Sequence, residues 1–228
     1  MNKNKVVFIT GALKGLGKNI CEHFLANGFT VFATARKIPD DVTNSEKLSW
    51  YALDITDYVQ CEEAIKKCNE KFGHIDILIN NASACVGGIT IPDLSQSKID
   101  TEINTTFKGA VYLSQIFVNT MRNRNQGKIF FISSTSGLQG ESGNKYYSIY
   151  AASKAALIRY SECLNQDISQ YNMQSHVIVP CNMRDSDFAN QEAVSFSDVS
   201  SLLLKMTDIG DNISFSQVFL RPARIAEE

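Results

Sequence analysis

The segment Thr10-Gly11-Ala12-Leu13-Lys14-Gly15-Leu16-Gly17 joins a short apolar run to a helical pattern. The run before it, Lys5–Thr10, is rich in β-branched and aromatic residues and predicts a strand. After it, an apolar stripe of helical period runs from Leu16 to Leu25 and stops before Gly28, a good C-cap residue. Glycines at such a turn let the backbone approach a pyrophosphate at a helix N-terminus. Because the spacing is not G-x-G-x-x-G, a tight turn without a ligand is the alternative.

The rest of the chain alternates short β-like runs with longer helical patterns, which is typical of βαβ units and a mostly parallel sheet. The other predicted strands are Thr30–Ala35, Leu48–Leu53, Ile75–Asn80, Lys128–Ser133, Ser175–Pro180 and Ile213–Leu220. The other predicted helices are Tyr58–Lys71, Ser97–Met121, Tyr150–Gln170 and Phe196–Met206. We therefore expect one α/β domain over residues 1–228, a Rossmann-like, doubly wound parallel seven-stranded sheet with its ligand crevice at the carboxyl ends of the strands.

Composition narrows the class of protein further. Of 228 residues, 44% are hydrophobic and 20% are charged, a balance that excludes disordered and fibrous chains. The net charge of −2 gives no general attraction to nucleic acid or anionic membranes. The sequence shows neither a signal-peptide pattern nor an 18-residue apolar stretch. We therefore expect a cytoplasmic protein that binds neither nucleic acid nor membranes. The six cysteines form no CxxC pair and only three histidines accompany them, so we expect free thiols and no metal site.

Polar clusters follow two further strands, as function in a doubly wound sheet requires: Asn80-Asn81-Ala82-Ser83 and Ser133-Ser134. Tyr150 and Lys154 are four residues apart and share one helix face. A cation there would favour the phenolate and lower the tyrosine pKa from about 10, which suits Tyr150 to proton exchange with a carbonyl or alcohol oxygen. For such a pair in isolation, ordinary packing with a solvated amine is the alternative.

Taken in order, these motifs resemble those of the short-chain dehydrogenase/reductase family. Thr10–Gly17 is similar to its T-G-x-x-x-G-x-G turn, Asn80–Ser83 to its N-N-A-G, and Tyr150–Lys154 to its Y-x-x-x-K. Asn104 and Ser134 match its helix asparagine and its serine. The resemblance is strong over about residues 5–182 and weaker beyond them.

The resemblance implies a catalytic set of Asn104, Ser134, Tyr150 and Lys154. In it, Tyr150 exchanges the proton, Ser134 positions the substrate oxygen, Lys154 tunes the phenol and holds the nicotinamide ribose, and Asn104 supports a water relay. The implied reaction is carbonyl reduction by hydride from NADPH, on a small-molecule or carrier-bound substrate, in a homodimer or homotetramer. The alternatives are an epimerase, isomerase or dehydratase with the same site, and a non-catalytic dinucleotide-binding regulator.

The charges after the second strand favour NADP(H) over NAD(H). An NAD enzyme of this architecture commonly has an acid there, whereas this chain has Ala35-Arg36-Lys37. With Lys14, Arg36 could clamp a 2′-phosphate by charge-assisted hydrogen bonds. The alternative is that Arg36 and Lys37 are solvated and that Asp40 or Asp41 reaches the ribose. The residues predicted to bind the cofactor are Gly11, Lys14, Gly15, Leu16, Gly17, Arg36, Asp54, Asn81, Ala82, Tyr150, Lys154 and Pro180.

The resemblance also shows departures after the sixth strand. Pro180 is followed by Cys181 where the family has glycine, and Asp185 stands about where it has a threonine that holds the nicotinamide carboxamide. The substrate-lid region, about residues 183–196, is short, which indicates an open site or one completed by another subunit. Asp54 matches the family's adenine-contacting acid, with a helix N-cap or turn role as the alternative.

Overall fold

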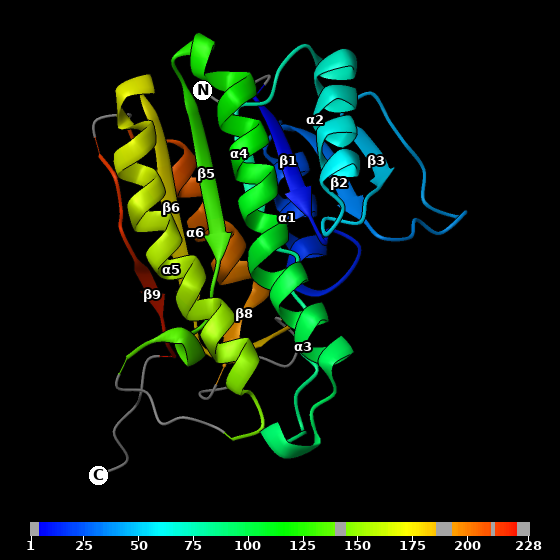
Figure 1. The fold of residues 1–228 in the computed structure, drawn as a ribbon. Helices are drawn as coiled ribbons and strands as arrows, with labels where there is room; N and C mark the ends of the chain where they lie inside the picture. Colours follow the sequence, from blue (N-terminus) through cyan, green and yellow to red (C-terminus); the bar gives the residue numbers. More distant parts are fainter. Residues whose placement is uncertain (1–4, 140–144, 186–192, 211–212, 223–228) are drawn as a thin grey trace.

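One parallel sheet forms the centre of the computed structural model, which describes residues 5–139, 145–185, 193–210 and 213–222 (Figure 1). The strands are β1 (Val6–Thr10), β2 (Thr30–Ala35), β3 (Leu48–Ala52), β4 (Ile77–Asn80), β5 (Gly127–Ile132), β6 (Met173–Pro180) and β9 (Val218–Leu220). Their order is β3-β2-β1-β4-β5-β6-β9, and every neighbouring pair is parallel. The strand order reverses between β1 and β4, so the predicted doubly wound seven-stranded sheet is confirmed.

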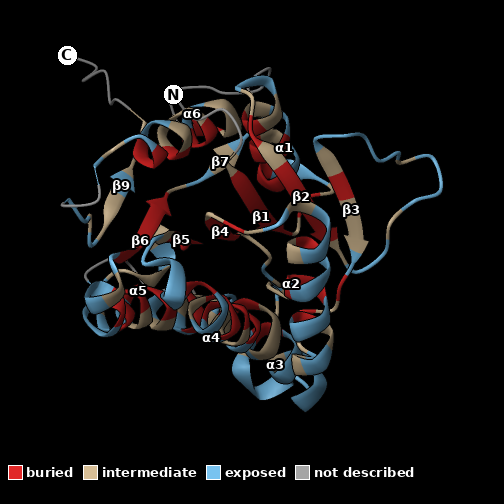
Figure 2. Cartoon of the chain, turned by 90° about the horizontal axis from the view of Figure 1, so that it is seen from above, coloured by how far each residue is buried: buried red, intermediate tan, exposed pale blue. Residues whose placement is uncertain are grey.

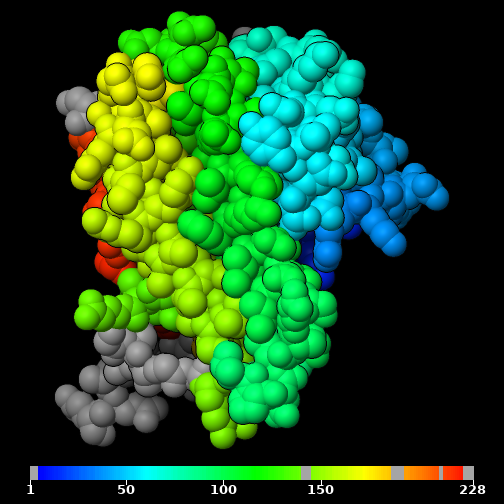
Figure 3. Space-filling view, viewed as in Figure 1, coloured from blue at the N-terminus to red at the C-terminus, as the bar shows by residue number. Residues whose placement is uncertain are grey.

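Helices cover both faces of the sheet (Figure 2). The helices are α1 (Gly15–Ala26), α2 (Tyr58–Phe72), α3 (Gln96–Ile103), α4 (Gly109–Met121), α5 (Ser148–Ile168) and α6 (Phe196–Thr207). On one face α1 packs against α6, while α2, α4 and α5 lie next to one another across the other (Figure 3). Among the described residues, no helix has the length and apolarity that crossing a bilayer requires.

Side chains alternate between two hydrophobic clusters, one on each face. Phe8 of β1 lies in the cluster that includes Leu113 of α4, and its neighbour Ile9 lies in the cluster that includes Ile20 of α1 and Leu203 of α6. This follows from the period of two along a strand. All five residues of β1 are buried, as expected for a strand covered on both faces. Each fully buried side chain of this size contributes about 1.5–3 kcal/mol, so the core holds the strand ends in place.

Two predicted elements differ from the structure. The helix expected over Ser97–Met121 is interrupted by a π-helical turn, η2 (Asn104–Lys108), in which the Gly109 N–H bonds to the carbonyl of Asn104. The last strand, expected over Ile213–Leu220, is confined to Val218–Leu220. Upstream of it, Phe215 N donates to Nδ1 of the buried His176 (3.2 Å), so its backbone bonds to a side chain instead of a neighbouring strand.

Candidate functional site

The turn between β1 and α1 leaves no room for side chains at two of its glycines. Gly11 has φ of +65°, a conformation that strains any residue with a Cβ. A Cβ on Gly17 would overlap the carbonyl oxygen of Gly11. Both glycines therefore let the backbone of the turn pack closely on itself and on the loop after β4, at the carboxyl edge of the sheet.

The N-terminus of α1 is left without a cap. Its N-cap residue, Lys14, makes no side-chain hydrogen bond to the helix, and the first turn holds no acidic residue. By contrast, Asp57 caps α2 by accepting from Val59 N and Gln60 N, and Ser195 caps α6 by accepting from Asp198 N. Because the first N–H groups of a helix need an acceptor, this uncapped end fits a pyrophosphate.

The glycine turn is fixed to the loop after β4 through Thr10. Oγ1 of Thr10 accepts from the backbone N–H groups of Asn81 and Ala82, both at 3.0 Å. The Asn81 side chain in turn donates to the carbonyl oxygens of Thr10 (2.9 Å) and Gly11 (3.2 Å). Asn80 fixes the strand end by donating to Ser114 of α4 (3.2 Å). Asn81 and Ala82 thus lie beside the turn, and their N–H groups hold it.

Arg36 lies at the same edge of the sheet. It is exposed and directly follows β2, whose Thr34 carbonyl accepts from Ala12 N of the glycine turn (2.9 Å). Lys14 is also exposed, on that turn. Both cations therefore follow strands that are neighbours in the sheet.

Asp54 forms a turn, the role predicted from the sequence as the alternative to an adenine contact. Its Oδ1 accepts from the backbone N–H (2.9 Å) and the hydroxyl (2.8 Å) of Thr56, whereas the N-cap of α2 is Asp57. After β6, which ends at Pro180, Cys181 N donates to the Leu220 carbonyl of β9 (3.0 Å).

Only the ends of the predicted lid are described. β7 (Met183–Arg184) pairs with β8 (Val194–Ser195), and Asp185 is exposed after β7. Residues 186–192, within the lid, lie outside the described residues. Phe196, the first residue of α6, approaches the glycine turn: a Cβ on Gly15 would lie 3.9 Å from its ring.

The structure brings Ser134, Tyr150 and Lys154 together. Ser134 follows β5, and its hydroxyl bonds to the Tyr150 side chain. The Lys154 ammonium lies 5.4 Å from the centre of the Tyr150 ring and donates to the Ile132 carbonyl of β5 (2.7 Å). The Ser133 hydroxyl donates to the Lys154 carbonyl (2.8 Å), which ties the end of β5 to α5. Two hydrogen bonds therefore hold this part of α5 against the sheet.

The electrostatics of Tyr150 differ from the sequence prediction. Burial raises the pKa of Tyr150, the charges of Cys85 and Glu102 raise it further, and the hydrogen bond from Ser134 acts in the opposite direction. Burial lowers the pKa of Lys154 to about 8. The prediction that Lys154 lowers the tyrosine pKa is wrong for the protein alone: desolvation outweighs it, and the ammonium bonds to the Ile132 carbonyl.

Asn104 lies on the neighbouring helical segment as the first residue of η2. Phe107 of η2 contacts Tyr160 of α5 edge-on, with ring centres 6.0 Å apart, so the segment packs on the helix that carries Tyr150 and Lys154. π-Helical turns occur frequently at functional sites, because the extra residue shifts which side chains face a cleft.

Three contacts around the loop after β4 were not predicted. Ser83, where the resembled motif has glycine, bonds through its hydroxyl to Thr106 of η2 (3.1 Å). Glu102 of α3 is 3% exposed and accepts from Val86 N (2.6 Å). Tyr147, at the N-cap of α5, packs its ring on Gly87. The sequence does contain a signal for the burial of Glu102 and Thr106. They stand three and seven residues after Ile99, which is the spacing of a buried helix face.

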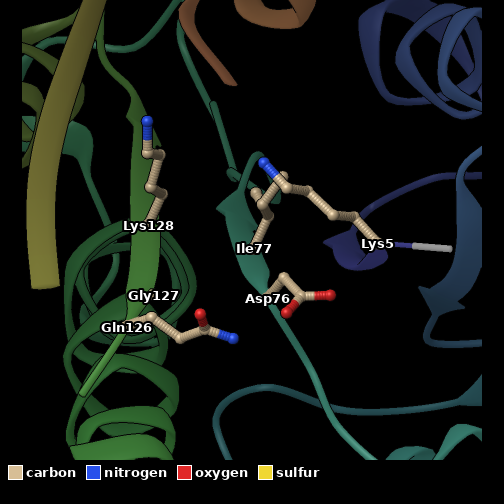
Figure 4. Close-up of a pocket in the computed structure, with 6 residues that line it drawn as sticks. All are labelled: Lys5, Asp76, Ile77, Gln126, Gly127 and Lys128. Carbon is tan, nitrogen blue, oxygen red and sulfur yellow. The ribbon is translucent and has the colours of Figure 1, made fainter. Parts of the chain in front are cut away.

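A separate hollow of about 80 Å³ lies at the opposite edge, at the amino ends of β4 and β5 (Figure 4). It is lined by Lys5, Asp76, Ile77, Gln126, Gly127 and Lys128. Lys128 donates to the Ile209 carbonyl just beyond α6, Lys5 donates to the Thr207 carbonyl (3.5 Å), and Asp76 accepts from Val6 N (2.8 Å). These charged groups bond to the backbone of the fold itself.

Comparison with known proteins agrees with this geometry. A family model described as short chain dehydrogenase matches residues 5–194. An oxidoreductase of Botryotinia fuckeliana is 35% identical over 186 residues, which are 79% of this chain and 66% of that protein. The 3-ketodihydrosphingosine reductase of Bacteroides thetaiotaomicron is 29% identical over 224 residues, 98% of this chain and 76% of that protein. The closed form of a serine dehydrogenase complexed with NADP+ superposes with a TM-score of 0.85 at 25% identity, covering 98% of both chains.

Proposed function

The chain belongs to the short-chain dehydrogenase family, and on that basis we propose that it reduces a carbonyl to a secondary alcohol with NADP(H) as cofactor. The observation that carries the proposal is the cluster of Ser134, Tyr150 and Lys154 at the sheet edge that also holds the uncapped glycine turn. Binding a dinucleotide alone would not require a partly buried phenol bonded to a serine hydroxyl.

The residues present fit the cofactor. The tight turn that Gly11 and Gly17 allow and the uncapped N-terminus of α1 bind the pyrophosphate, because the first N–H groups of this helix have no side-chain acceptor. Arg36 and Lys14 bind the 2′-phosphate by charge-assisted hydrogen bonds. When bound, NADPH supplies the hydride that the carbonyl carbon receives. The NADP+ complex of the similar serine dehydrogenase supports this choice of cofactor.

Tyr150 donates the proton. Because its pKa is raised, the phenol holds its proton at neutral pH and is ready to donate it from Oη to the substrate oxygen as the alcohol forms. The Ser134 hydroxyl positions that oxygen, Lys154 contacts the nicotinamide ribose and the phenol, and Asn104 supports the resupply of protons through water. In the reductive direction the phenol acts as the acid, so a protonated Tyr150 suits carbonyl reduction.

The substrate is a small-molecule or carrier-bound carbonyl compound. The 3-ketodihydrosphingosine reductase among the relatives supports a ketone as the reacting group. We also propose that residues 1–228 act as one catalytic domain in the cytoplasm, and that α4 and α5 pair across subunits in a homodimer or homotetramer.

Substitution of Tyr150 tests the proposal. Tyr150→Phe is expected to abolish turnover, a loss of about 10²–10⁴-fold in kcat, because it removes the proton donor and keeps the ring. Its affinity for NADPH, followed by fluorescence titration, is expected to stay near that of the wild type. The control is Tyr160→Phe on the same helix, expected to reduce the same carbonyl panel at the wild-type rate. Unchanged turnover in Tyr150→Phe, or product formed without net NADPH consumption, would refute the proposal.

A further inference from the structure

Glu102 is a buried carboxylate that the reaction as described does not use. It lies on α3, 3% exposed, and its Oε1 accepts from Val86 N at 2.6 Å. Carboxylates are almost never fully buried unless they are paired or serve a specific contact. Its partner belongs to the loop after β4, which directly follows the residues that hold the glycine turn.

This loop is held between two helical segments. On one side, the Thr106 hydroxyl bonds to Ala84 N and to the Ala84 carbonyl, both at 3.1 Å, and Glu102 holds Val86. On the other side, Gly87 accommodates the Tyr147 ring, and Gly88 N donates to the carbonyl of Tyr146 (3.2 Å). The loop thus connects α3 and η2 to the start of α5.

The same contacts lead to the proton donor. Tyr147 is the N-cap of α5, and its carbonyl accepts from Ala151 N (2.8 Å), so the turn that it begins contains Tyr150. In the described residues, the groups that act on the phenol are Lys154 on its own helix, Ser134 after β5, Cys85 on the loop and Glu102 on α3. The charge of Glu102 opposes ionisation of Tyr150, and the Ser134 hydroxyl favours it.

We propose that Glu102 is a positioning residue of the active site: its buried carboxylate holds the loop after β4 against the first turn of α5, the turn that contains Tyr150. The inference rests on the proposed function, in which Tyr150 is the acid. Glu102 acts through Val86 and through its charge, and not by touching the substrate.

Two substitutions separate these effects. Glu102→Gln keeps an oxygen for Val86 N and removes the charge, so ionisation of Tyr150 becomes easier. The alkaline loss of carbonyl reduction is then expected about half a pH unit or more below that of the wild type. Glu102→Ala also removes the acceptor, and an additional loss of about tenfold to a hundredfold in kcat/KM is expected from the misplaced loop. Asp100→Asn, an exposed carboxyl on the same helix, is the matched control and keeps the wild-type profile.

A second measurement does not depend on turnover. Titration of tyrosinate by ultraviolet absorbance in the full chain, with Tyr150→Phe subtracted, reports the ionisation of Tyr150 directly. All variants are compared in a Cys85→Ser background, because a charge on that thiol also acts on Tyr150. A wild-type Tyr150 titration in Glu102→Gln overturns the inference, and so does wild-type kcat/KM in Glu102→Ala. If Tyr150→Phe retained turnover, the proposed function would fail first, so the two failures are distinguishable.

Discussion

The two edges of the sheet each bury a lysine, Lys154 at the carboxyl edge and Lys128 at the amino edge, with 3% and 7% exposure. Lys128 bonds to the Ile209 carbonyl beyond the C-terminus of α6, where the helix dipole favours a cation. Lys154 lies within α5, bonds to the Ile132 carbonyl, and has the phenol ring of Tyr150 beside it. The Lys128 charge thus holds the end of α6, whereas the Lys154 charge lies where a ligand would contact it.

The pKa of Lys154 fits a place where a ligand binds. Burial lowers the pKa of Lys154 to about 8, so removal from water already costs the charged form part of its stability. A cofactor ribose or phosphate that accepts a hydrogen bond from Lys154 offsets that cost. An amine with a lowered pKa next to a phenol is suited to proton chemistry.

The largest expected effect is on kcat, and it tests the contrast between Lys154 and Lys128. Lys154→Met should lower kcat by about 10²–10³-fold, because the nicotinamide ribose and Tyr150 lose their cation. Lys128→Met should leave kcat near the wild-type value and lower the free energy of unfolding by about 1–3 kcal/mol, since the Ile209 carbonyl loses its donor. Steady-state kinetics and urea unfolding of both variants test this. Similar kcat losses in the two would contradict the division between the edges.

A smaller effect is expected on the pH dependence of stability, through a buried histidine of the sheet. His176 lies across from Phe130 in the sheet, and burial, with a lesser effect of the Lys128 charge, lowers its pKa to about 4 from an unfolded value near 6.5. Between pH 4 and pH 6.5, His176 binds a proton in the unfolded chain but not in the folded chain. Stability is therefore full above pH 6.5 and falls as the pH drops toward 4. By linkage this amounts to about 3 kcal/mol.

The variant for this test is His176→Phe, which fits between the rings of Phe130 and Phe215. Its urea midpoint is expected to depend less on pH between 6.5 and 4 than that of the wild type. Equal slopes in the two proteins would show that another group causes the acid loss. Activity at neutral pH is expected to be retained, because the ring lies away from Tyr150.

The smallest effect concerns cofactor choice at the carboxyl edge. Arg36→Ser should reduce the preference for NADPH over NADH, measured as the ratio of kcat/KM values, by about tenfold to a hundredfold. The reason is the loss of charge-assisted hydrogen bonds to the 2′-phosphate. Lys37→Ser, at the adjacent exposed cation, is the matched control and should have the smaller effect. An unchanged ratio in Arg36→Ser would remove Arg36 from the cofactor site and leave the fold unaffected.

Much of the fold follows from local patterns. The β-branched and aromatic run Lys5–Thr10 and the helical stripe after it predict β1 and α1, and their repetition predicts the parallel seven-stranded sheet that the structure shows. The spacing of Tyr150 and Lys154 places both on one face of α5, and the position of Ser134 after β5 brings it to them. These predictions succeed because periodicity and spacing along one element are properties of nearby residues.

Other features depend on residues far apart in the chain. The sequence pattern over Ser97–Met121 predicts one continuous helix although Gly109 follows η2 directly, and the interruption accompanies the bonds of Thr106 to Ala84. The prediction for the Tyr150 pKa took account of Lys154 alone and omitted the burial and the Glu102 charge that raise it.

The amino-acid sequence by itself therefore determined the family, the seven strands and the identity of the phenol, the amine and the serine. The tertiary structure alone decided which way the Lys154 ammonium points, how strongly Tyr150 holds its proton, and that Glu102 is buried beside the loop after β4. The physical reason is that desolvation and charge act through space. Their strength depends on which segments the fold places around a group, and no spacing along the chain encodes that.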